Sequence, residues 1–420
     1  MIKAISGTIL ARILTTVMGL LVSVIAGHAL GTSGLGTIGL IVLGITLVRM
    51  LMEMVGGTAL VYLVPRVALS KLLLPCYLWA VFAGLIGFLL IDLLELVPDG
   101  FAVHVACLAL IQSMNAIHLN VLVGQQRIRA NNLVTVVQAV VLTAAFGLFT
   151  RDPEPDNFTF VHAAYISATA ALALSTWAIG REWTVPHPQQ VHVLRLLLRQ
   201  GAYVQMANGM QLLNYRLAYW LIERFRGTAQ LGIYTVANQL AESAWLVPKS
   251  LALVLYSKVS NLHQAQEQRA LTLAFLKASM CFAGLVTAVL LLLPGRLFQW
   301  AFGPEVTGIT PLLALLAPGI LAMAASQAFS HFFSGTARNI HNVIGSGLGL
   351  VATVAAGLTL IPAYGLPGAA IAATLAYGTN ALYQTVAFMR ITGSSFKDLL
   401  PSAEDGRRLR GMFYKGRHQH

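Results

Sequence analysis

Twelve apolar segments, each long enough to cross a lipid bilayer as a helix, divide this chain of 420 residues. One crossing needs about 20 mostly apolar residues, and the connections between the segments are short. The predicted spans cover residues 8–30, 35–63, 72–93, 101–123, 131–149, 160–180, 202–223, 232–256, 273–294, 311–334, 342–361 and 367–391. This pattern predicts an all-α integral membrane protein.

The composition excludes most soluble classes of protein. Hydrophobic residues make up 57% of the chain and charged residues only 10%, whereas about a quarter of a soluble domain is charged. A chain so poor in charge cannot cover a water-facing surface, which rules out a cytosolic enzyme or a disordered scaffold. Cys76, Cys107 and Cys281 lie in or beside apolar runs without metal-ligand spacing, so we expect no metal site and no disulfide.

The positive charges predict how the chain crosses the membrane. The formal net charge is +12, from 27 Lys and Arg against 15 Asp and Glu. With the N-terminus inside, 19 of these cations fall in cytoplasmic segments, 4 fall outside and 4 lie within spans. Such an excess is typical of cytoplasmic loops. We therefore expect a multi-pass membrane protein with both termini in the cytoplasm, whose first apolar run is a span rather than a cleaved signal peptide.

The two halves of the chain resemble each other. The hexapeptide at 31–36, GTSGLG, returns at 227–232 as GTAQLG. GQQR at 124–127 with Asn131 matches GTAR at 335–338 with Asn342, and ISAT at 166–169 matches IAAT at 371–374. The three offsets are 196, 211 and 205 residues. The shared order of the matches indicates a duplicated unit of six spans.

An even number of spans in each unit brings both units into the bilayer from the same side. The repeats are then parallel, related by a pseudo-two-fold axis along the membrane normal, and such repeats place the substrate path where the halves meet. The predicted organisation is an N-terminal lobe (1–181), a cytoplasmic linker (182–200), a C-terminal lobe (201–391) and a basic cytoplasmic tail (392–420).

Several motifs resemble those of one membrane-protein family. LGTSGLG at 30–36 leads into a span that ends in YLVPR at 62–66, LGIYTVA at 231–237 is followed by WLVP at 245–248, and residues 360–372 read LIPAYGLPGAAIA. These stretches resemble polysaccharide or O-antigen flippases, which form the polysaccharide transporter branch of the multidrug/oligosaccharidyl-lipid/polysaccharide (MOP) exporter superfamily. The resemblance extends over nearly the whole chain.

The resemblance implies both a fold and a function. The fold would be two six-helix lobes, as in the multidrug (MATE) transporters of the superfamily. The function would be to move an undecaprenyl-pyrophosphate-linked oligosaccharide, the repeat unit of an O-antigen or exopolysaccharide, across the bacterial inner membrane. The implied partners are this lipid-linked glycan, membrane lipids, a polysaccharide polymerase and glycosyltransferases, with no nucleic acid and no cofactor.

Charged residues within the spans are candidates for contact with a substrate. A charge in the hydrocarbon core is costly and usually faces a cavity or a partner. Arg12 lies in the first span, and Arg49 and Glu53 are four residues apart in the second, hence on one helix face. These two side chains could neutralise each other and only hold the helix in place. Alternatively, Arg49 could meet an anionic head group while Glu53 positions it or carries a proton.

Two polar stripes in the second half favour a cavity. One third of the circumference of the seventh span carries Gln205, Asn208, Tyr215, Arg216, Tyr219 and Glu223. On the eighth span Asn238, Glu242, Trp245 and Lys249 step by four, three and four. Interhelical hydrogen bonds could explain one or two amides. Two stripes with charges predict instead a polar path through the membrane.

A diphosphate-linked sugar would divide these residues between two roles. Arg12, Arg49, Arg216 and Lys249 are the candidates for the pyrophosphate, since arginine offers a bidentate fork to phosphate oxygens. Gln205, Asn208, Tyr219, Asn238 and Trp245 are the candidates for the glycan. Glu53 and Glu242 are the candidates for ion coupling.

No catalytic or nucleotide-binding motif appears in the sequence, so we do not expect an enzyme. A drug or cation antiporter of the same superfamily is the first alternative, although it would need acidic residues to dominate the path. A membrane glycan ligase or transferase is the second, although such enzymes usually carry a long catalytic loop outside the membrane, and no predicted outer loop here is long.

Overall fold

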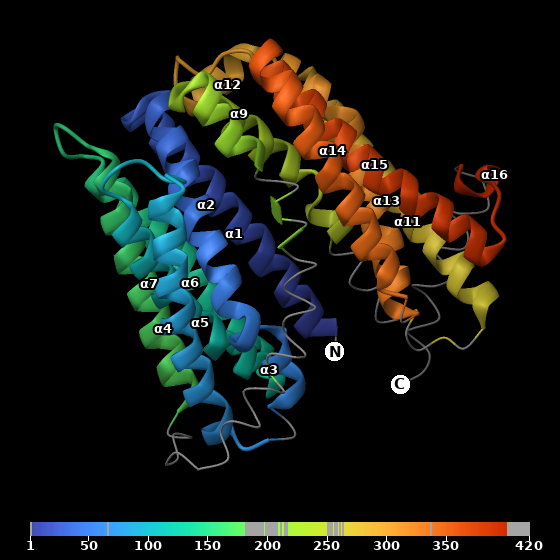
Figure 1. Cartoon of the computed structure of the whole chain (residues 1–420), viewed down its shortest axis with the longest axis horizontal. Coiled ribbons are helices and arrows are strands. Elements are labelled where there is room, and N and C mark those ends of the chain that lie inside the picture. The colour runs from blue at the N-terminus through green and yellow to red at the C-terminus, as the bar shows by residue number, and fades with distance from the viewer. Residues whose placement is uncertain are drawn as a thin grey trace. The chain divides into compact units, whose positions relative to one another are not determined.

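The computed structural model describes residues 2–64, 67–180, 197, 209–210, 212–213, 217–249, 255, 259, 262, 264–336 and 338–400. Every regular element among these residues is a helix (Figure 1). The predicted all-α architecture is therefore confirmed.

Nine helices of the described part of the chain are long and apolar enough to cross a membrane. They are α1 (Ile2–Ala29), α2 (Gly31–Gly56), α4 (Leu69–Leu93), α5 (Ala102–Gly124), α6 (Ile128–Phe149), α7 (Asn157–Ile179), α11 (Ala265–Leu292), α13 (Ile309–Gly335) and α14 (Ile340–Tyr364). The last predicted span corresponds to α15 (Leu366–Thr392), and α9 (Thr228–Ser243) covers the start of the eighth. The structure describes residues 209–210, 212–213 and 217–223 of the seventh predicted span, and residues 244–249 and 255 of the rest of the eighth.

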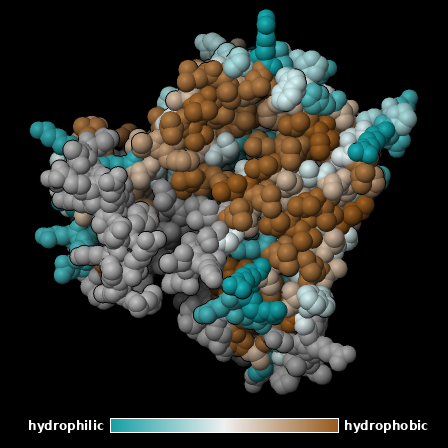
Figure 2. All heavy atoms as spheres, turned by 180° about the vertical axis from the view of Figure 1, so that it is seen from behind, coloured by the Kyte–Doolittle hydropathy of each residue, from teal (hydrophilic) through white to brown (hydrophobic). Residues whose placement is uncertain are grey.

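Apolar side chains cover the outward faces of these helices. On α4, Leu78, Phe82, Leu85 and Leu89 are all more than half exposed, and their spacing of four, three and four places them on one face. Hydrophobic residues also cover much of the surface shown in Figure 2. Apolar side chains need no hydrogen-bond partners, and lipid offers none, so this surface is stable in a bilayer.

The structure departs from the sequence prediction at several helix boundaries. The predicted connection at 31–34 is already helical, because a single turn at Leu30 and Gly31 (φ +67°) joins α1 to α2. The predicted span 35–63 is broken at Gly57, after which a short α3 covers Thr58–Leu63. In the second half, α14 continues through Pro362 and ends at Tyr364, and an additional short helix, α12 (Gly295–Phe302), was not predicted.

The predicted duplication is visible in the order and packing of the helices. α5, α6 and α7 correspond to α13, α14 and α15. α5 packs on α7 as α13 packs on α15, and α6 packs on α7 as α14 packs on α15. α4 contacts α5 as α11 contacts α13. The same arrangement of four helices therefore occurs once in each half of the sequence.

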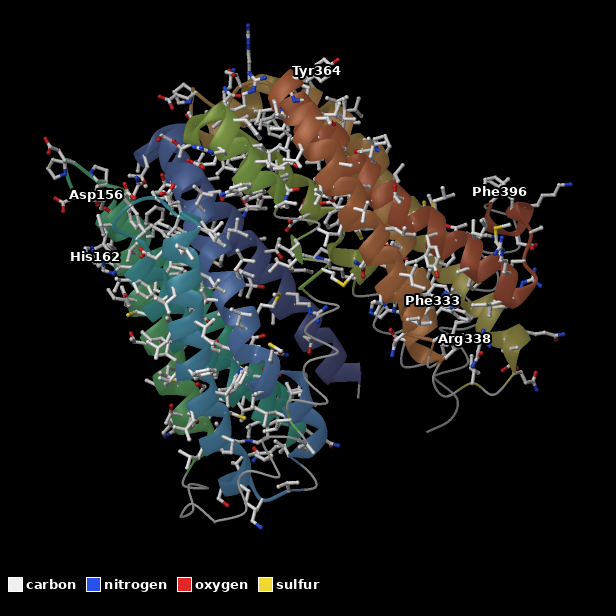
Figure 3. All side chains as sticks on the ribbon, viewed as in Figure 1. Asp156, His162, Phe333, Arg338, Tyr364 and Phe396 are labelled. Atoms are coloured by element: carbon white, nitrogen blue, oxygen red, sulfur yellow. The ribbon has the colours of Figure 1, made fainter. Side chains whose placement is uncertain are left out.

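The helix connection matched in the two halves also repeats its backbone hydrogen bonds. The Arg127 amide donates to the Leu122 carbonyl at 2.8 Å, and the Arg338 amide donates to the Phe333 carbonyl at 2.7 Å. Both bonds span five residues and follow the same type of helix end. Figure 3 shows Arg338 and Tyr364 at opposite ends of α14. The sequence match between GQQR and GTAR thus marks equivalent turns.

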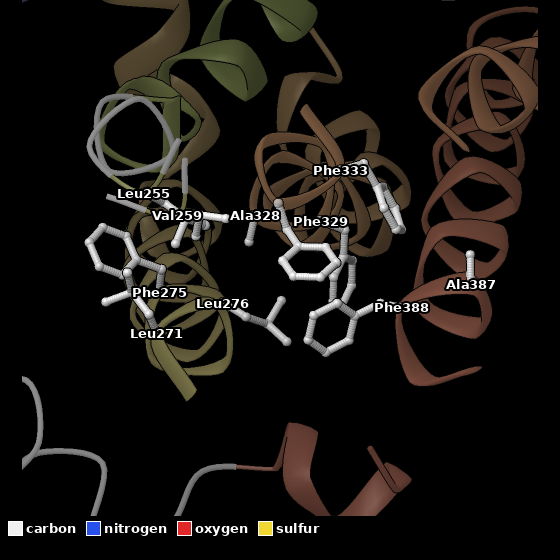
Figure 4. Close-up of a cluster of buried hydrophobic side chains, with 11 residues drawn as sticks. Leu255, Val259, Leu271, Phe275, Leu276, Ala328, Phe329, Phe333, Ala387 and Phe388 are labelled. Carbon is white, nitrogen blue, oxygen red and sulfur yellow. The ribbon is translucent and has the colours of Figure 1, made fainter. Parts of the chain in front are cut away.

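The chain forms two compact units. The first comprises Met1–Val236 and Arg296–Thr307, and the second comprises Ala237–Gly295 and Gly308–His420. The second unit contains a phenylalanine-rich cluster (Figure 4) in which Phe329 and Phe332 both pack against Phe388, with ring centroids 5.0 Å apart. This cluster joins α11, α13 and α15.

A short helix after α15, α16 (Phe396–Leu399), is fixed to α11 by an ion pair. Asp398 accepts hydrogen bonds from the amide and hydroxyl of Ser395 and from Arg269 Nη2, the last at 2.7 Å. These donors, the Ser395 amide first, lower the pKa of Asp398 below its ordinary value of 3.8. The carboxylate therefore holds α16 at neutral pH and would release it as the pH falls through the lowered pKa.

We expect Asp398→Asn to increase amide hydrogen exchange in residues 395–399 more than Arg269→Gln does. Asp398 provides both the helix cap and the ion pair, whereas Arg269 provides only the ion pair. Exchange measured at neutral pH by mass spectrometry tests this order, with Lys397→Gln as the neighbouring control. Wild-type exchange in Asp398→Asn would contradict the assignment.

Candidate functional site

The matched hexapeptides of the two halves pack directly against each other. A Cβ atom on Gly36 of α2 would overlap the carbonyl oxygen of Thr228 on α9, and a Cβ on Gly232 would overlap the carbonyl oxygen of Thr32. The offset of 196 residues relates Gly36 to Gly232 and also Thr32 to Thr228, so the contact is reciprocal. The side-chain hydroxyls of Ser33 and Thr228 are 3.3 Å apart at the same place. This is a pseudo-two-fold helix crossing.

The surface of α2 that meets α9 continues along the helix as a seam of residues. Gly39, one turn beyond Gly36, faces the Thr235 hydroxyl. Leu35, next to the crossing, is buried, whereas Val42 is 45% exposed and the later seam residues are partly exposed. The seam is thus closed at the crossing and accessible farther along α2. Further steps of three and four residues from Gly39 reach Val42, Thr46, Arg49 and Glu53.

Arg49 and Glu53 form an ion pair on this accessible part of the seam. Arg49 Nη2 lies 2.6 Å from Glu53 Oε1, with about a third and a quarter of the two side chains exposed. Arg49 Nη1 also donates to Gln112 of α5 at 3.4 Å, while its Nε–H is buried without a hydrogen-bond partner among the described residues. The guanidinium therefore retains donor capacity.

The helix that carries this pair is interrupted one turn later, at Gly57. Asn120 donates to the Gly56 carbonyl at 3.1 Å, and the Trp79 indole donates to the Leu51 carbonyl at 3.0 Å. Backbone groups at membrane depth need such partners, because lipid offers none. The surrounding helices α4 and α5 therefore stabilise the end of α2, which fixes the position of the Arg49–Glu53 pair.

Arg12 lies on a polar face of α1. Leu10, Ile13, Val17 and Leu21 are exposed on one side of the helix. At 100° per residue, Arg12, Thr15, Gly19 and Ser23 lie on the opposite side. Arg12 is exposed and makes no ion pair with any described residue. A charged side chain away from the apolar face indicates a polar surface along α1.

The predicted stripe on the eighth span is partly buried. Asn238 is 1% exposed and donates to Glu242 Oε1 at 2.8 Å. Trp245 is also 1% exposed, and its indole donates to the Ile320 carbonyl and contacts Tyr377 edge to face. Lys249 is exposed, with Nζ 5.5 Å from the Trp245 ring centroid. Asn238 and Trp245 are therefore packed in the described state, while Lys249 remains at the surface.

Of the remaining predicted site residues, three are not described by the structure and one is buried. Gln205, Asn208 and Arg216 lie outside the described residues. Tyr219 is 2% exposed and packs edge to face on Tyr234, so its ring is interior in this state.

Two relevant side chains were missed by the sequence prediction of the site. Gln112 had no helical neighbour that marked it as a partner of Arg49, which lies 63 residues away. Glu305 follows a glycine and a proline in a loop, yet it binds the first turn of α2, 273 residues away. No local pattern in the sequence indicates either contact.

Replacing either crossing glycine by alanine should destabilise the protein to a similar degree, because each Cβ would collide with a backbone carbonyl. Overpacking of this kind costs roughly 1–3 kcal/mol. Thermal unfolding of Gly36→Ala and Gly232→Ala in detergent provides the measurement. Gly378→Ala in α15 is the control, since a Cβ there meets nothing within 4 Å. Unfolding of both crossing variants at the wild-type temperature would exclude this close approach.

Comparisons with known proteins agree with this architecture. Residues 103–311 match a family model described as polysaccharide biosynthesis protein. No curated protein matches the sequence.

Solved membrane transporters share the fold at low sequence identity. An inward-facing MATE family multidrug transporter of the MOP superfamily is 14% identical, with a TM-score of 0.71 over 90% of this chain and 94% of that one. The lipid II flippase MurJ, in an inward closed conformation, is 14% identical, with a TM-score of 0.70 over 95% and 89%. A point mutant of the Vibrio cholerae MATE transporter VcmN is 13% identical, with a TM-score of 0.65 over 95% and 98%.

The duplicated helices, the match of residues 103–311 to a polysaccharide biosynthesis family and the fold shared with solved membrane transporters agree with the resemblance seen in the sequence, and they identify the chain as a multi-pass membrane protein.

Proposed function

We propose that this protein is a flippase that moves an undecaprenyl-pyrophosphate-linked oligosaccharide across the bacterial inner membrane by alternating access. The observation that carries the proposal is the Arg49–Glu53 pair, partly exposed on the seam that α2 shares with α9 at the crossing. The match to a polysaccharide biosynthesis family and the likeness to a lipid II flippase support this class of substrate. In this proposal both termini are cytoplasmic and transport involves no catalysis.

The charged groups would receive the diphosphate. Arg49 keeps unused donors while paired with Glu53, and a diphosphate can accept a bidentate fork from it. Arg12 on the polar face of α1 is a second cation of the same repeat. Arg216 and Lys249 remain candidates from the second half. Glu53 would hold the Arg49 fork in position when no substrate is bound.

The sugar would contact the predicted amide and aromatic residues. Gln205 and Asn208 remain candidates on sequence grounds. Asn238, Tyr219 and Trp245 are buried in the described state, so the proposal requires a rearrangement that uncovers them before they meet a glycan. The repeat unit of an O-antigen or exopolysaccharide, made by glycosyltransferases and consumed by a polymerase, fits this set of groups.

A cation or drug antiporter is the second candidate. The fold is as similar to MATE multidrug transporters as to the flippase. Glu53 and Glu242 would then bind protons, sodium or cationic substrates, and the arginines would only balance these carboxylates.

Arg49 and Glu53 variants distinguish the two functions. We expect Arg49→Ala to abolish surface glycan in cells that depend on this protein, and Arg49→Lys to retain part of it, because lysine keeps the charge but loses the fork. Glu53→Gln should retain more glycan than Arg49→Ala. Glycan is measured on the cell surface, at equal amounts of variant in the membrane fraction.

Arg151→Ala is the matched control, because this arginine is exposed in the loop after α6 and is not part of the seam. Full glycan display with Arg49→Ala would refute the flippase. Protection of cells from cationic drugs that is lost in Glu53→Gln would establish the antiporter instead.

A further inference from the structure

The segment 295–307 belongs to the second half of the sequence, between α11 and α13, yet it packs on the turn between α1 and α2. Gly27 of α1 approaches the backbone of Phe302 so closely that a Cβ atom would overlap the Phe302 carbonyl. In return, a Cβ on Gly303, whose φ is +107°, would lie 2.6 Å from the Gly27 carbonyl oxygen. The two segments therefore meet backbone to backbone.

Polar contacts hold the same two segments together. One carboxylate oxygen of Glu305, Oε2, accepts hydrogen bonds from the Thr32 amide at 3.0 Å and the Thr32 hydroxyl at 2.9 Å. This carboxylate satisfies an amide in the first turn of α2, where the helix dipole favours a negative charge. His28 Nε2 also lies 3.0 Å from the Trp300 carbonyl oxygen.

The chemistry of these contacts permits their release. Glu305 is exposed to solvent, so water can replace each of its hydrogen bonds when the segment leaves. The Thr32 amide, followed by the Thr32 hydroxyl, lowers the pKa of Glu305 below its ordinary value of 4.5. The carboxylate is thus charged at neutral pH, and its release there does not depend on protonation.

The position of the contact connects it to the seam. Thr32 binds Glu305 through its amide and side chain, while its carbonyl oxygen faces Gly232 at the crossing. Ser33, the next residue, approaches Thr228 of α9. One turn of α2 therefore contacts both segment 295–307 and α9, and both of these come from the second half of the sequence.

We propose that segment 295–307 is a releasable clasp at the outer end of the α2–α9 seam. With the N-terminus inside, as predicted, this end lies at the α1–α2 turn. The clasp holds it closed and separates from the turn when the path opens to the outside. The proposal rests on the proposed transport function and topology, in which alternating access requires the outer ends of the repeats to separate. Glu305 is the residue through which the clasp binds α2.

The first experiment measures access to the seam from outside the cell. Thr46→Cys places a thiol on the seam ten residues beyond Gly36, in a background without Cys76, Cys107 and Cys281. Intact cells are treated with a membrane-impermeant maleimide. We expect Glu305→Gln to increase labelling several-fold, because a neutral amide binds the first turn of α2 less strongly than a carboxylate does.

Glu154→Gln is the matched control, since Glu154 is an exposed acidic residue of another predicted outer loop. The clasp is overturned if Glu305→Gln labels no more than Glu154→Gln. This result does not depend on the substrate, so the failure of the clasp and the failure of the proposed function are distinguishable. If the wild-type protein moved no glycan while Glu305→Gln still increased labelling, only the proposed function would be refuted.

A reversible cross-link tests whether a clasp that cannot separate keeps the seam inaccessible. Thr32→Cys and Glu305→Cys are joined by a short thiol-reactive reagent that reduction can cleave, again in the background without the native cysteines. The reporter at position 46 is then an azide-bearing amino acid, which the thiol reagent does not modify, and a membrane-impermeant cyclooctyne labels it. Labelling should fall when the link is closed and recover after reduction. Equal labelling with the link closed and open would overturn the clasp.

Discussion

The approach of two backbones at Gly36 and Gly232 is the contact on which the arrangement of the first unit depends. Carbonyl oxygens of Thr32 and Thr228 occupy the volume that any side chain at these glycines would fill. Helices that meet so closely gain contacts between backbone atoms, which are a main source of helix association where lipid removes the hydrophobic driving force. The crossing fixes one end of α2, and the direction of the seam toward Arg49 follows from it.

The residues of the seam that pack against α9 are buried, whereas those proposed to bind the substrate are partly exposed. Near the crossing, small residues allow contact and leave no room for water. Farther along the same face, the Arg49–Glu53 pair is partly exposed, and Gln112 supplies a further acceptor. A charge pair at this depth is costly unless water or polar groups surround it. The change from glycine to charge along one helix face thus marks the transition from a closed to an accessible region.

Much of the fold was predictable because the bilayer imposes a simple constraint on length and polarity. In the described part of the chain, the nine apolar helices and α15 match predicted spans, whereas α12 was missed because eight residues do not give a span-like signal. The hexapeptide repeat predicted that the two segments were equivalent, but similarity in sequence does not imply that equivalent segments touch.

The candidate site was predictable in part. The spacing of Arg49 and Glu53 was sufficient to pair them, since neighbours on a helix are determined by its period. The burial of Tyr219 and Trp245 could not be predicted, because an aromatic side chain with a polar atom suits either a core or a sugar-binding surface. The contact of Glu305 with Thr32 depends on how distant segments meet, which local patterns do not encode.

The interruption at Gly57 has a mechanical consequence for the second span. The hydrogen-bond ladder of α2 ends there, and Asn120 and Trp79 connect its last turns to α5 and α4 rather than to α3. Twisting of α2 about its own axis is consequently transmitted sideways into those two helices. Because α3 packs on α5, such a rotation reaches α3 through its neighbour as well as through the chain.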